Sequence, residues 1–287
     1  KTAKLKQINK KGSKTRVIIF ADDTVVYYSS DNFGEIQNVL NSELLSISNF
    51  LYDNELVANL KQGKTESMLF GTSKKLTKVP ERLDLHFRNQ EINFTNRYKY
   101  LGTTVDSSLQ LSDNFDKQYK KASSRLNLIS KLRKNLTNDA AKNVFEKMVV
   151  PLILYNCTVH LNLNQTQKNK LQSLQNRAIK IVDDAKVKLA NIIKKISIHT
   201  CLLVKKCLIG EVCSNFIEYF HLKKHLYNSR NNNIQVELPS IKLEFARKGF
   251  FFMGAKIYNE LPAEIRQEEN LNFFKKKIRN YHKEAVT

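Results

Sequence analysis

The chain has no tryptophan, only four cysteines, few glycines and prolines, and no long apolar run. No apolar stretch approaches the ~20 residues that a membrane-spanning helix needs, and the first residues are basic and polar, unlike a signal peptide. The cysteines form no CxxC pair and are too sparse for a disulfide framework, as is typical of a reducing compartment. We therefore expect an intracellular protein without membrane contacts. The sequence does not distinguish the nucleus from the cytoplasm.

Acidic residues are scarce relative to basic ones. The 287 residues include 48 Lys and Arg against 27 Asp and Glu, which gives a formal net charge of +21. Such an excess repels itself unless a polyanion or counterions neutralise it. The apolar share of 41% is enough for a sizeable core, so a globular protein is expected. Nucleic acid is the first partner that this composition predicts.

Two β-branched and aromatic runs near the start of the chain predict a hairpin. They cover residues 17–20 and 25–28, and the polar interval 21–24 between them is typical of a turn. This turn contains two adjacent carboxylates, Asp22 and Asp23. At ~4 Å and an effective dielectric of ~20, two such charges repel by roughly 4 kcal/mol, so a bound cation such as Mg²⁺ or Mn²⁺ would stabilise the turn. The alternative is ordinary turn chemistry, in which Asp is favoured for its hydrogen bonds to the backbone.

The segments that follow the hairpin predict an α+β domain. Apolar residues recur at three- and four-residue steps over 35–51, which predicts an amphipathic helix capped by Asp31 or Asn32. Strand-like pieces are expected at 56–58, 65–70, 83–87 and 98–105. We place the end of this domain near residue 113, so the first domain is 1–113.

From residue 114 the apolar period becomes helical, and the rest of the chain is expected to be mostly α-helix. After a first helix that begins at 114, further helices are expected at 138–150, 166–182, 185–197 and 202–222, a loop at 228–240, and a basic helix at 273–282. We divide this part into a helical region over 114–235 and a basic C-terminal unit over 236–287.

The cysteines invite a zinc interpretation, because Cys201, Cys207 and Cys213 recur with five residues between them and His199 and His221 lie nearby. A six-residue step turns ~240° around a helix and therefore places successive thiols on different faces. Zinc sites normally use pairs that are two to four residues apart. We expect these cysteines to behave as small apolar residues instead.

Three short boxes carry a resemblance to a known family. The string Phe-Ala-Asp-Asp-Thr at 20–24, between two apolar strands, resembles the aromatic-Ala-Asp-Asp box in the palm of reverse transcriptases. The strings at 60–71 (Leu-Lys-Gln-Gly-Lys-Thr and onward) and 98–103 (Tyr-Lys-Tyr-Leu-Gly-Thr) resemble the next two boxes of LINE-type enzymes, which lack long terminal repeats. Segments 170–178 and 248–262 also resemble the region that follows the palm.

The resemblance implies a partial palm, an antiparallel hairpin with a packed helix, followed by a mainly α-helical thumb and C-terminal region. It implies that Asp22 is a metal-binding catalytic residue, that Asp23 supports or shares this role, and that two Mg²⁺ ions act on the incoming deoxynucleotide. Lys64 matches a lysine that helps to neutralise or protonate the departing pyrophosphate, or else is a solvated lysine at a strand edge.

Primer and template binding are also implied by the resemblance. Four residues match the hairpin that grips the primer end, with strand packing as the alternative for the tyrosines: Tyr98, Tyr100, Leu101 and Gly102. The thumb would hold the duplex of RNA template and DNA primer by its phosphates. Candidates for this contact are Lys117, Lys120, Lys121 and Arg125, and solvated helix faces are the alternative.

The chain departs from the family pattern upstream of the hairpin. The family has a third metal-binding carboxylate and a nucleotide-selecting segment before this box, whereas only 21 residues precede Asp22 and none of them is Asp or Glu. We therefore expect the isolated chain to be catalytically incomplete, unless another chain supplies the missing palm and fingers. The alternatives are a non-catalytic module that binds RNA or DNA through its basic helical half, and a poorly folded relic.

Overall fold

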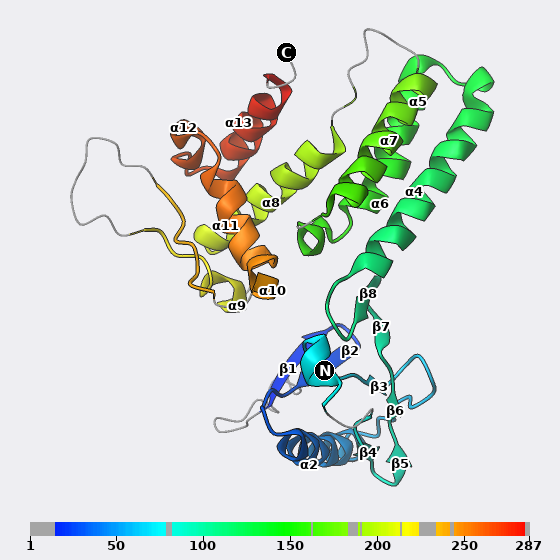
Figure 1. The fold of residues 1–287 in the computed structure, drawn as a ribbon, viewed down its shortest axis with the longest axis vertical. Helices are drawn as coiled ribbons and strands as arrows, with labels where there is room; N and C mark the ends of the chain where they lie inside the picture. The colour runs from blue at the N-terminus through cyan, green and yellow to red at the C-terminus, as the bar shows by residue number, and fades with distance from the viewer. Residues whose placement is uncertain are drawn as a thin grey trace. The chain divides into compact units, whose positions relative to one another are not determined.

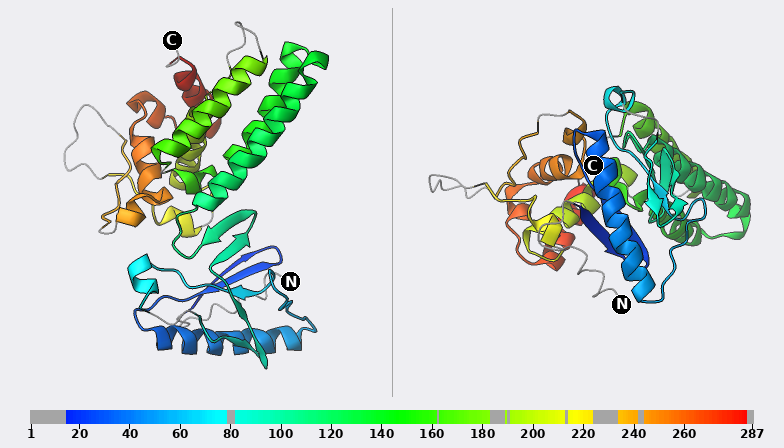
Figure 2. Two further views of the ribbon diagram at one scale, coloured as in Figure 1. Left: turned by 45° about the vertical axis from the view of Figure 1, so that its right-hand side comes forward. Right: turned by 90° about the horizontal axis from the view of Figure 1, so that it is seen from below.

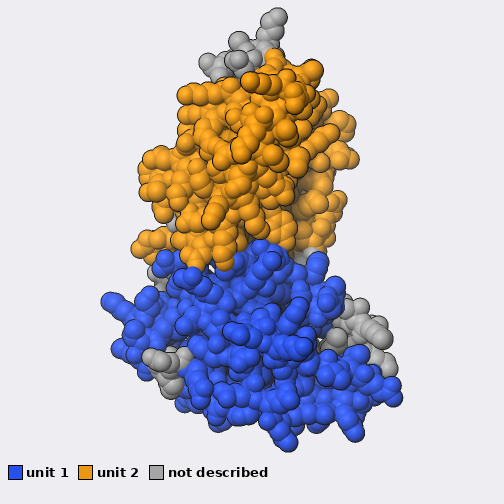
Figure 3. All heavy atoms as spheres, turned by 90° about the vertical axis from the view of Figure 1, so that its right-hand side faces the viewer, with its two compact units in different colours: residues 1–111 blue, residues 112–287 orange. Residues whose placement is uncertain are grey.

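The computed structural model describes residues 15–78, 82–161, 163–182, 189, 191–212, 214–223, 234–241 and 244–284. Most of the basic segment 1–16, part of the expected loop 228–240 and Cys213 lie outside the described residues. The chain divides into two compact units, residues 1–111 and 112–287, which Figure 3 shows in two colours. Each unit is described by itself below.

The first unit begins with the expected antiparallel hairpin. Strand β1 (Arg16–Phe20) pairs with β2 (Asp23–Tyr27), and Phe20 lies opposite Asp23 (Figure 1). The turn therefore consists of Ala21 and Asp22 alone, and the four-residue turn expected at 21–24 was too long. Because β-branched residues favour extended backbone, Thr24 joins the strand rather than the turn.

Helix α2 (Phe33–Asp53) confirms the amphipathic segment and packs its apolar side on the core of the first unit. Asn32 is the N-cap, and its side chain accepts a hydrogen bond from the backbone N–H of Glu35 at 3.2 Å. Asp31 instead pairs with Lys75 at 2.7 Å. The core comprises Leu83, Leu85 and Ile92, with Phe33, Ile36, Leu40 and Leu44 of α2 packed against it.

The remaining strands of this unit are short and form three further two-stranded sheets. Strand β3 (Glu66–Ser67) runs parallel to β6 (Asn93–Phe94), β4 (His86–Phe87) pairs with β5 (Gln90–Glu91), and β7 (Arg97–Tyr100) pairs with β8 (Thr103–Asp106). A short helix, α3 (Ser73–Leu76), was not expected.

Two strand predictions in this unit need correction. Residues 56–58 form no strand, because they follow the end of α2 in an exposed segment without a pairing partner among the described strands. Segment 98–105 is a hairpin rather than one strand, since Leu101 and Gly102 both take positive φ angles of 44° and 78°. Positive φ at both central residues is the pattern of a type I′ turn, which suits a two-residue hairpin.

The second unit is helical and contains two apolar cores. The first core joins α4 (Ser112–Leu132), α5 (Asn138–Val144), η3 (Phe145–Val149), α6 (Val150–Leu154), η4 (Cys157–His160) and α7 (Gln165–Val182) to the start of α8 (Ile192–Leu208). Figures 1 and 2 show α4 and α7 side by side. Short η2 (Arg133–Asn135) ends α4.

The second core lies around the rest of α8. Its other helices are α11 (Phe250–Asn259), α12 (Ala263–Arg266) and α13 (Leu271–Glu284). The short helices α9 (Ser214–Ile217) and α10 (Glu244–Arg247) contact α8 and α11, respectively. Helices α7 and α13 confirm the helices expected at 166–182 and 273–282.

Three helix predictions in this unit were wrong in detail. The segment expected as one helix over 138–150 consists of α5, a π-helical turn (η3) and the start of α6. The α-helix is interrupted because Pro151 lacks the backbone N–H that an uninterrupted α-helix would use there. Where the chain is described, the helices expected at 185–197 and 202–222 are the long helix α8 and the short helix α9. Helix α8 runs through the expected break and ends at Leu208, and Gly210, whose φ is 76°, follows the C-cap residue Ile209.

Strands occur almost entirely in the first unit, and the described part of the second unit adds only a bridge between Leu222 and Val236. The chain is therefore of the α+β class, as expected. Across the described residues, no helix combines the length and apolar character needed to cross a membrane.

Candidate active site in the first unit

The tip of the β1–β2 hairpin presents Asp22 and Asp23 to solvent. Ala21 has a φ of 53°, whereas Asp22 does not have positive φ, which is the pattern of a type II′ turn. Glycine is the usual residue at this first turn position, because an alanine there brings its Cβ close to the carbonyl oxygen. The backbone is therefore strained, by about 1–2 kcal/mol, immediately before the two carboxylates.

Three segments that are distant in sequence meet beside Asp23. Partial burial raises the pKa of Tyr98, and the negative charges of Asp23 and Glu66 raise it further. Burial also raises the pKa of Tyr100, and Asp23 adds to that shift. The Tyr98 hydroxyl donates a hydrogen bond to the backbone oxygen of Lys64 at 2.8 Å. Strands β7 and β2 and the segment before β3 thus form one cluster.

Lys64 lies in a turn that precedes β3. Gly63 has a φ of 79°, and its N–H donates to the Glu66 carboxylate at 2.7 Å. The Lys64 N–H donates to the backbone oxygen of Lys61 at 3.0 Å, and its side chain is exposed. The turn therefore fixes the Lys64 backbone against Tyr98 and leaves the ammonium group able to move.

The β7–β8 turn is the second strained turn of this cluster. Gly102 adopts its positive φ without strain, but a φ of 44° is unusual for a residue with a side chain as large as that of Leu101. Strain of this kind persists where the surrounding structure holds it, and it is enriched at functional sites. The β1–β2 and β7–β8 turns therefore each contain a non-glycine residue with positive φ.

The hairpin tip offers the carboxylates of Asp22 and Asp23 as metal ligands. Among the described residues, no group of three or more His, Cys, Asp or Glu side chains is arranged to hold a metal ion. Two carboxylates are nevertheless compatible with Mg²⁺, which commonly binds through one or two carboxylates together with substrate phosphates and water. The donor set therefore fits Mg²⁺ or Mn²⁺ when a phosphate ligand is present.

The described cysteines are buried in the cores of the second unit. Burial raises the pKa of the Cys157 thiol to about 11 and that of Cys201 to about 12, where the nearby Glu260 charge adds to the effect. Both thiols are therefore protonated at neutral pH. A protonated, buried thiol is a poor nucleophile and a poor metal ligand.

The predicted basic contacts on α4 differ in their surroundings. Lys117, Lys120 and Lys121 are exposed. Arg125 is also exposed, but its guanidinium donates to the backbone oxygen of Met148 at 2.9 Å. Arg125 therefore ties α4 to the π-helical turn, and a contact with phosphate would compete with this bond.

Other arginines of the second unit have structural contacts that the sequence did not suggest. Arg133, which directly follows α4, donates to the backbone oxygens of Ile181 and Leu136 at 2.6 Å. Arg177 of α7 donates to the Ser123 hydroxyl at 3.0 Å and so links α7 to α4. These residues hold helices together, and the exposed basic surface is correspondingly smaller than the charge count implies.

Comparisons of the chain with protein-family models, curated proteins and solved structures found no match.

Proposed function

We propose that this chain is the palm and thumb part of an RNA-directed DNA polymerase of the LINE type. The observation that carries the proposal is the cluster at the hairpin tip, where Asp23 lies close enough to Tyr98 and Tyr100 for its charge to raise both pKa values. These residues belong to two of the three boxes that suggested the family. Their proximity is what a site for metal, primer end and nucleotide requires.

In this proposal, Asp22 and Asp23 hold Mg²⁺ with the phosphates of a deoxynucleotide. The bound ion supplies charge neutralisation for the phosphates and favours the ionised 3′-hydroxyl of the primer. Tyr98 and Tyr100 of β7 position the primer end next to these carboxylates. Lys64 reaches from the neighbouring turn towards the departing pyrophosphate, whose charge its ammonium group reduces.

The surface of the hairpin supports a role as part of a larger palm. Ile18, Phe20 and Tyr27 are 45%, 60% and 42% exposed, and no third strand pairs with the β1–β2 sheet among the described residues. A two-stranded sheet with an open apolar face gains stability when further strands cover it. We propose that the strand which covers this face also brings the third carboxylate of the two-metal site.

Metal binding by the hairpin can be tested without catalysis. Titration with Mn²⁺ in the presence of a deoxynucleotide should broaden the NMR signals of the Tyr98 and Tyr100 rings, because the ion is paramagnetic. Asp22→Asn should remove most of this broadening. The matched control is Asp53→Asn, which removes an exposed carboxylate at the end of α2. Equal broadening in the wild type and both variants would contradict the proposed metal site.

Primer extension on an RNA template tests the chemistry itself. We expect no extension by the chain alone, because only two carboxylates are present at the site. Primer extension that disappears in Asp22→Asn and persists in Asp53→Asn would support the proposal that the chain is a polymerase. It would contradict the expectation that the chain alone is catalytically incomplete.

The exposed lysines of α4 favour a second candidate, a module that binds RNA without catalysis. Lys120 and Lys121 are adjacent and exposed, and the nearest acid of this helix turn, Asp116, is already paired with Lys170 at 2.6 Å. Phosphate contacts made by such lysines position a strand without reading its sequence.

Salt dependence tests this candidate. The logarithm of the RNA-binding constant should fall with the logarithm of salt concentration, with a slope of roughly −0.7 to −0.9 per neutralised phosphate. The variant Lys120→Gln/Lys121→Gln should reduce the slope by up to about two phosphates. The control Lys74→Gln/Lys78→Gln removes the same charge from exposed positions of the first unit and should change the slope less. Equal changes in both double variants would exclude a defined α4 site.

A further inference from the structure

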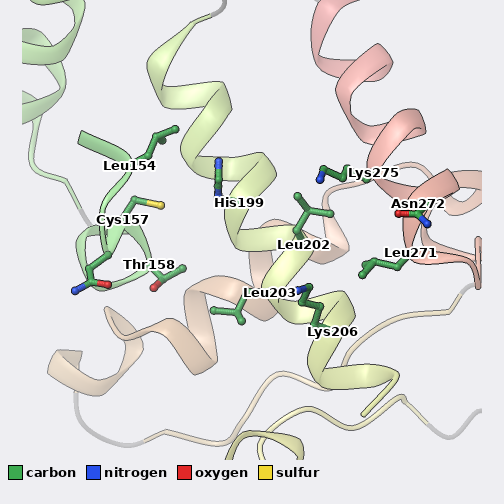
Figure 4. Close-up of a pocket in the computed structure, with 11 residues that line it drawn as sticks. Leu154, Cys157, Thr158, His199, Leu202, Leu203, Lys206, Leu271, Asn272 and Lys275 are labelled. Atoms are coloured by element: carbon green, nitrogen blue, oxygen red, sulfur yellow. The ribbon is translucent and has the colours of Figure 1, made fainter. Parts of the chain in front are cut away.

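A cavity of about 430 Å³ lies in the second unit, and none of the residues proposed above for metal, primer or RNA binding lines it. One face of α8 forms its base, with His199, Leu202, Leu203 and Lys206 at the i, i+3, i+4 and i+7 positions. Figure 4 shows η4 and the end of α6 on one side of these residues and the start of α13 on the other.

The lining separates into an apolar part and a polar rim. The apolar part consists of Leu154, Cys157, Leu202, Leu203 and Leu271. The rim consists of Asn156, Thr158, His199, Lys206, Asn272 and Lys275. Asn156, His199, Asn272 and Lys275 are exposed, so the cavity opens at the surface.

The rim is positively charged and has no acidic residue. Within the described part of the chain, neither Lys206 nor Lys275 has an ion-pair partner. Burial lowers the pKa of His199, and the positive charges of Arg279, Lys195 and Lys275 lower it further. Burial is the larger cause of this shift, and the three positive charges add repulsion that an anion placed among them would relieve.

We propose that this cavity binds a nucleotide, with its phosphate held by Lys206 and Lys275 and its base and sugar on the leucines. The proposed nucleotide is either free or one unit of an RNA strand, since both present the same phosphate and the same apolar body. The site is distinct from the hairpin carboxylates and does not depend on their chemistry.

The size and chemistry of the cavity favour this ligand class over simpler anions. Pockets of ~300–1,000 Å³ are typical of small organic ligands, and the apolar leucines would give an inorganic phosphate no contact. Two lysines within one rim provide charge-assisted hydrogen bonds to phosphate oxygens. The side-chain amides of Asn156 and Asn272 can hydrogen-bond to the edge of a base.

Calorimetric titration with ADP, at about 0.1 M salt to screen non-specific attraction, tests the proposal. Lys206→Gln/Lys275→Gln should weaken ADP binding about a hundredfold, taking about tenfold for each lost charge-assisted bond. The control Lys180→Gln/Lys276→Gln removes the same net charge at exposed positions of α7 and α13 that do not line the cavity. This control should change the affinity less than about threefold.

A second variant tests occupancy of the cavity without a change of charge. Asn272→Trp places a large side chain at the exposed rim, and it should abolish ADP binding while far-ultraviolet circular dichroism stays unchanged. Asp22→Asn should bind ADP as the wild type does, so that failure of the hairpin proposal and failure of this one are distinguishable.

The same titration with inorganic phosphate and with a short RNA oligonucleotide identifies the source of the nucleotide. RNA binding that is much tighter than ADP binding and is lost in both cavity variants assigns the site to a strand, and similar affinities assign it to a free nucleotide. Inorganic phosphate that binds as tightly as ADP would overturn the role of the leucines. Absence of ADP binding to the wild type, or equal losses in the cavity and control double variants, would overturn the proposal.

Discussion

Replacing Arg133 by alanine should destabilise the second unit. The guanidinium donates to the backbone oxygens of Ile181 at 2.6 Å, Val182 at 3.2 Å and Leu136 at 2.6 Å, and also to the Asn138 side chain. Ile181 and Val182 are the last residues of α7. Carbonyls at a helix C-terminus have no partner within the helix, so Arg133 caps α7 and complements its dipole.

The magnitude follows from these bonds. A hydrogen bond to a charged group contributes about 1.5–3 kcal/mol net, and the contributions of one side chain do not add fully. Arg133 is only half-buried, so water replaces part of the loss after substitution. We therefore expect Arg133→Ala to lower the free energy of unfolding by about 3 kcal/mol, a large share of the ~5–15 kcal/mol typical of a domain.

Urea unfolding followed by far-ultraviolet circular dichroism measures this loss, because the long helices of the second unit dominate the signal. With a slope of ~2 kcal/mol per molar urea, the midpoint should fall by about 1.5 M. Arg133→Lys keeps the positive charge but not the planar set of N–H donors of the guanidinium group. It should therefore lower the free energy of unfolding by at least half as much as Arg133→Ala does.

Lys134→Ala is the matched control, since Lys134 is an exposed neighbour in the same 3₁₀ turn. It should change the stability by less than about 0.5 kcal/mol. If Arg133→Ala unfolds at the wild-type urea concentration but binds RNA more weakly, the structural role is refuted and Arg133 belongs to an RNA-binding surface instead.

Two further predictions concern single carboxylates of the first unit. Partial burial would raise the pKa of Asp106, but hydrogen bonds from the Ser108 hydroxyl and three backbone N–H groups outweigh this and hold it below 3.8. The ionised Asp106 carboxylate therefore stabilises the fold above pH 3.8, and this stabilisation is lost as the pH falls through its folded-state pKa. Asp106→Asn should lower the free energy of unfolding by about 1–2 kcal/mol at pH 7 and by much less at pH 3. Asp23→Asn should lower the pKa values of Tyr98 and Tyr100. Ultraviolet titration measures these values, and the variants Tyr98→Phe and Tyr100→Phe identify which signal belongs to which tyrosine. If both pKa values stay unchanged in Asp23→Asn, the two hairpins do not meet.

Where the apolar period was strong, the sequence was sufficient to predict the local structure. Helix α2 and the first helix of the second unit follow directly from their spacing, and the β1–β2 hairpin follows from β-branched and aromatic residues. α8 was misjudged because Thr200, in the middle of the expected break, is polar. It is fully buried, and its hydroxyl donates to the Ile196 oxygen at 2.9 Å, so the buried face continues through it.

The candidate site was predictable as a set of motifs and not as an arrangement. The order of the boxes suggested Asp23, Tyr98 and Lys64, but only folding shows that the Tyr98 hydroxyl bonds to the Lys64 backbone. The role of Arg133 in capping α7 could not be predicted, because the backbone oxygens of Ile181 and Val182 lie 48 and 49 positions away and carry no residue-specific signal. The cavity in the second unit was missed for the same reason, since its leucines, asparagines and lysines come from three segments that are distant in the sequence.

The π-helical turn at Phe145–Val149 has a consequence for how the length of this chain can change. A bond from residue i to residue i+5 encloses one residue more than an α-helical bond, so this turn behaves as a single-residue insertion in an otherwise continuous helix. The first and last residues of the turn, Phe145 and Val149, and the following Val150 are all buried, which holds the extra residue in the outward bulge at Glu146–Met148. Loss of one residue from that bulge would leave the buried residues on both sides of it in the core. The same deletion in α4 or α7 would rotate every later side chain of that helix by about 100° around the helix axis. Deletions among relatives should therefore be tolerated at this turn before they are tolerated in the neighbouring helices.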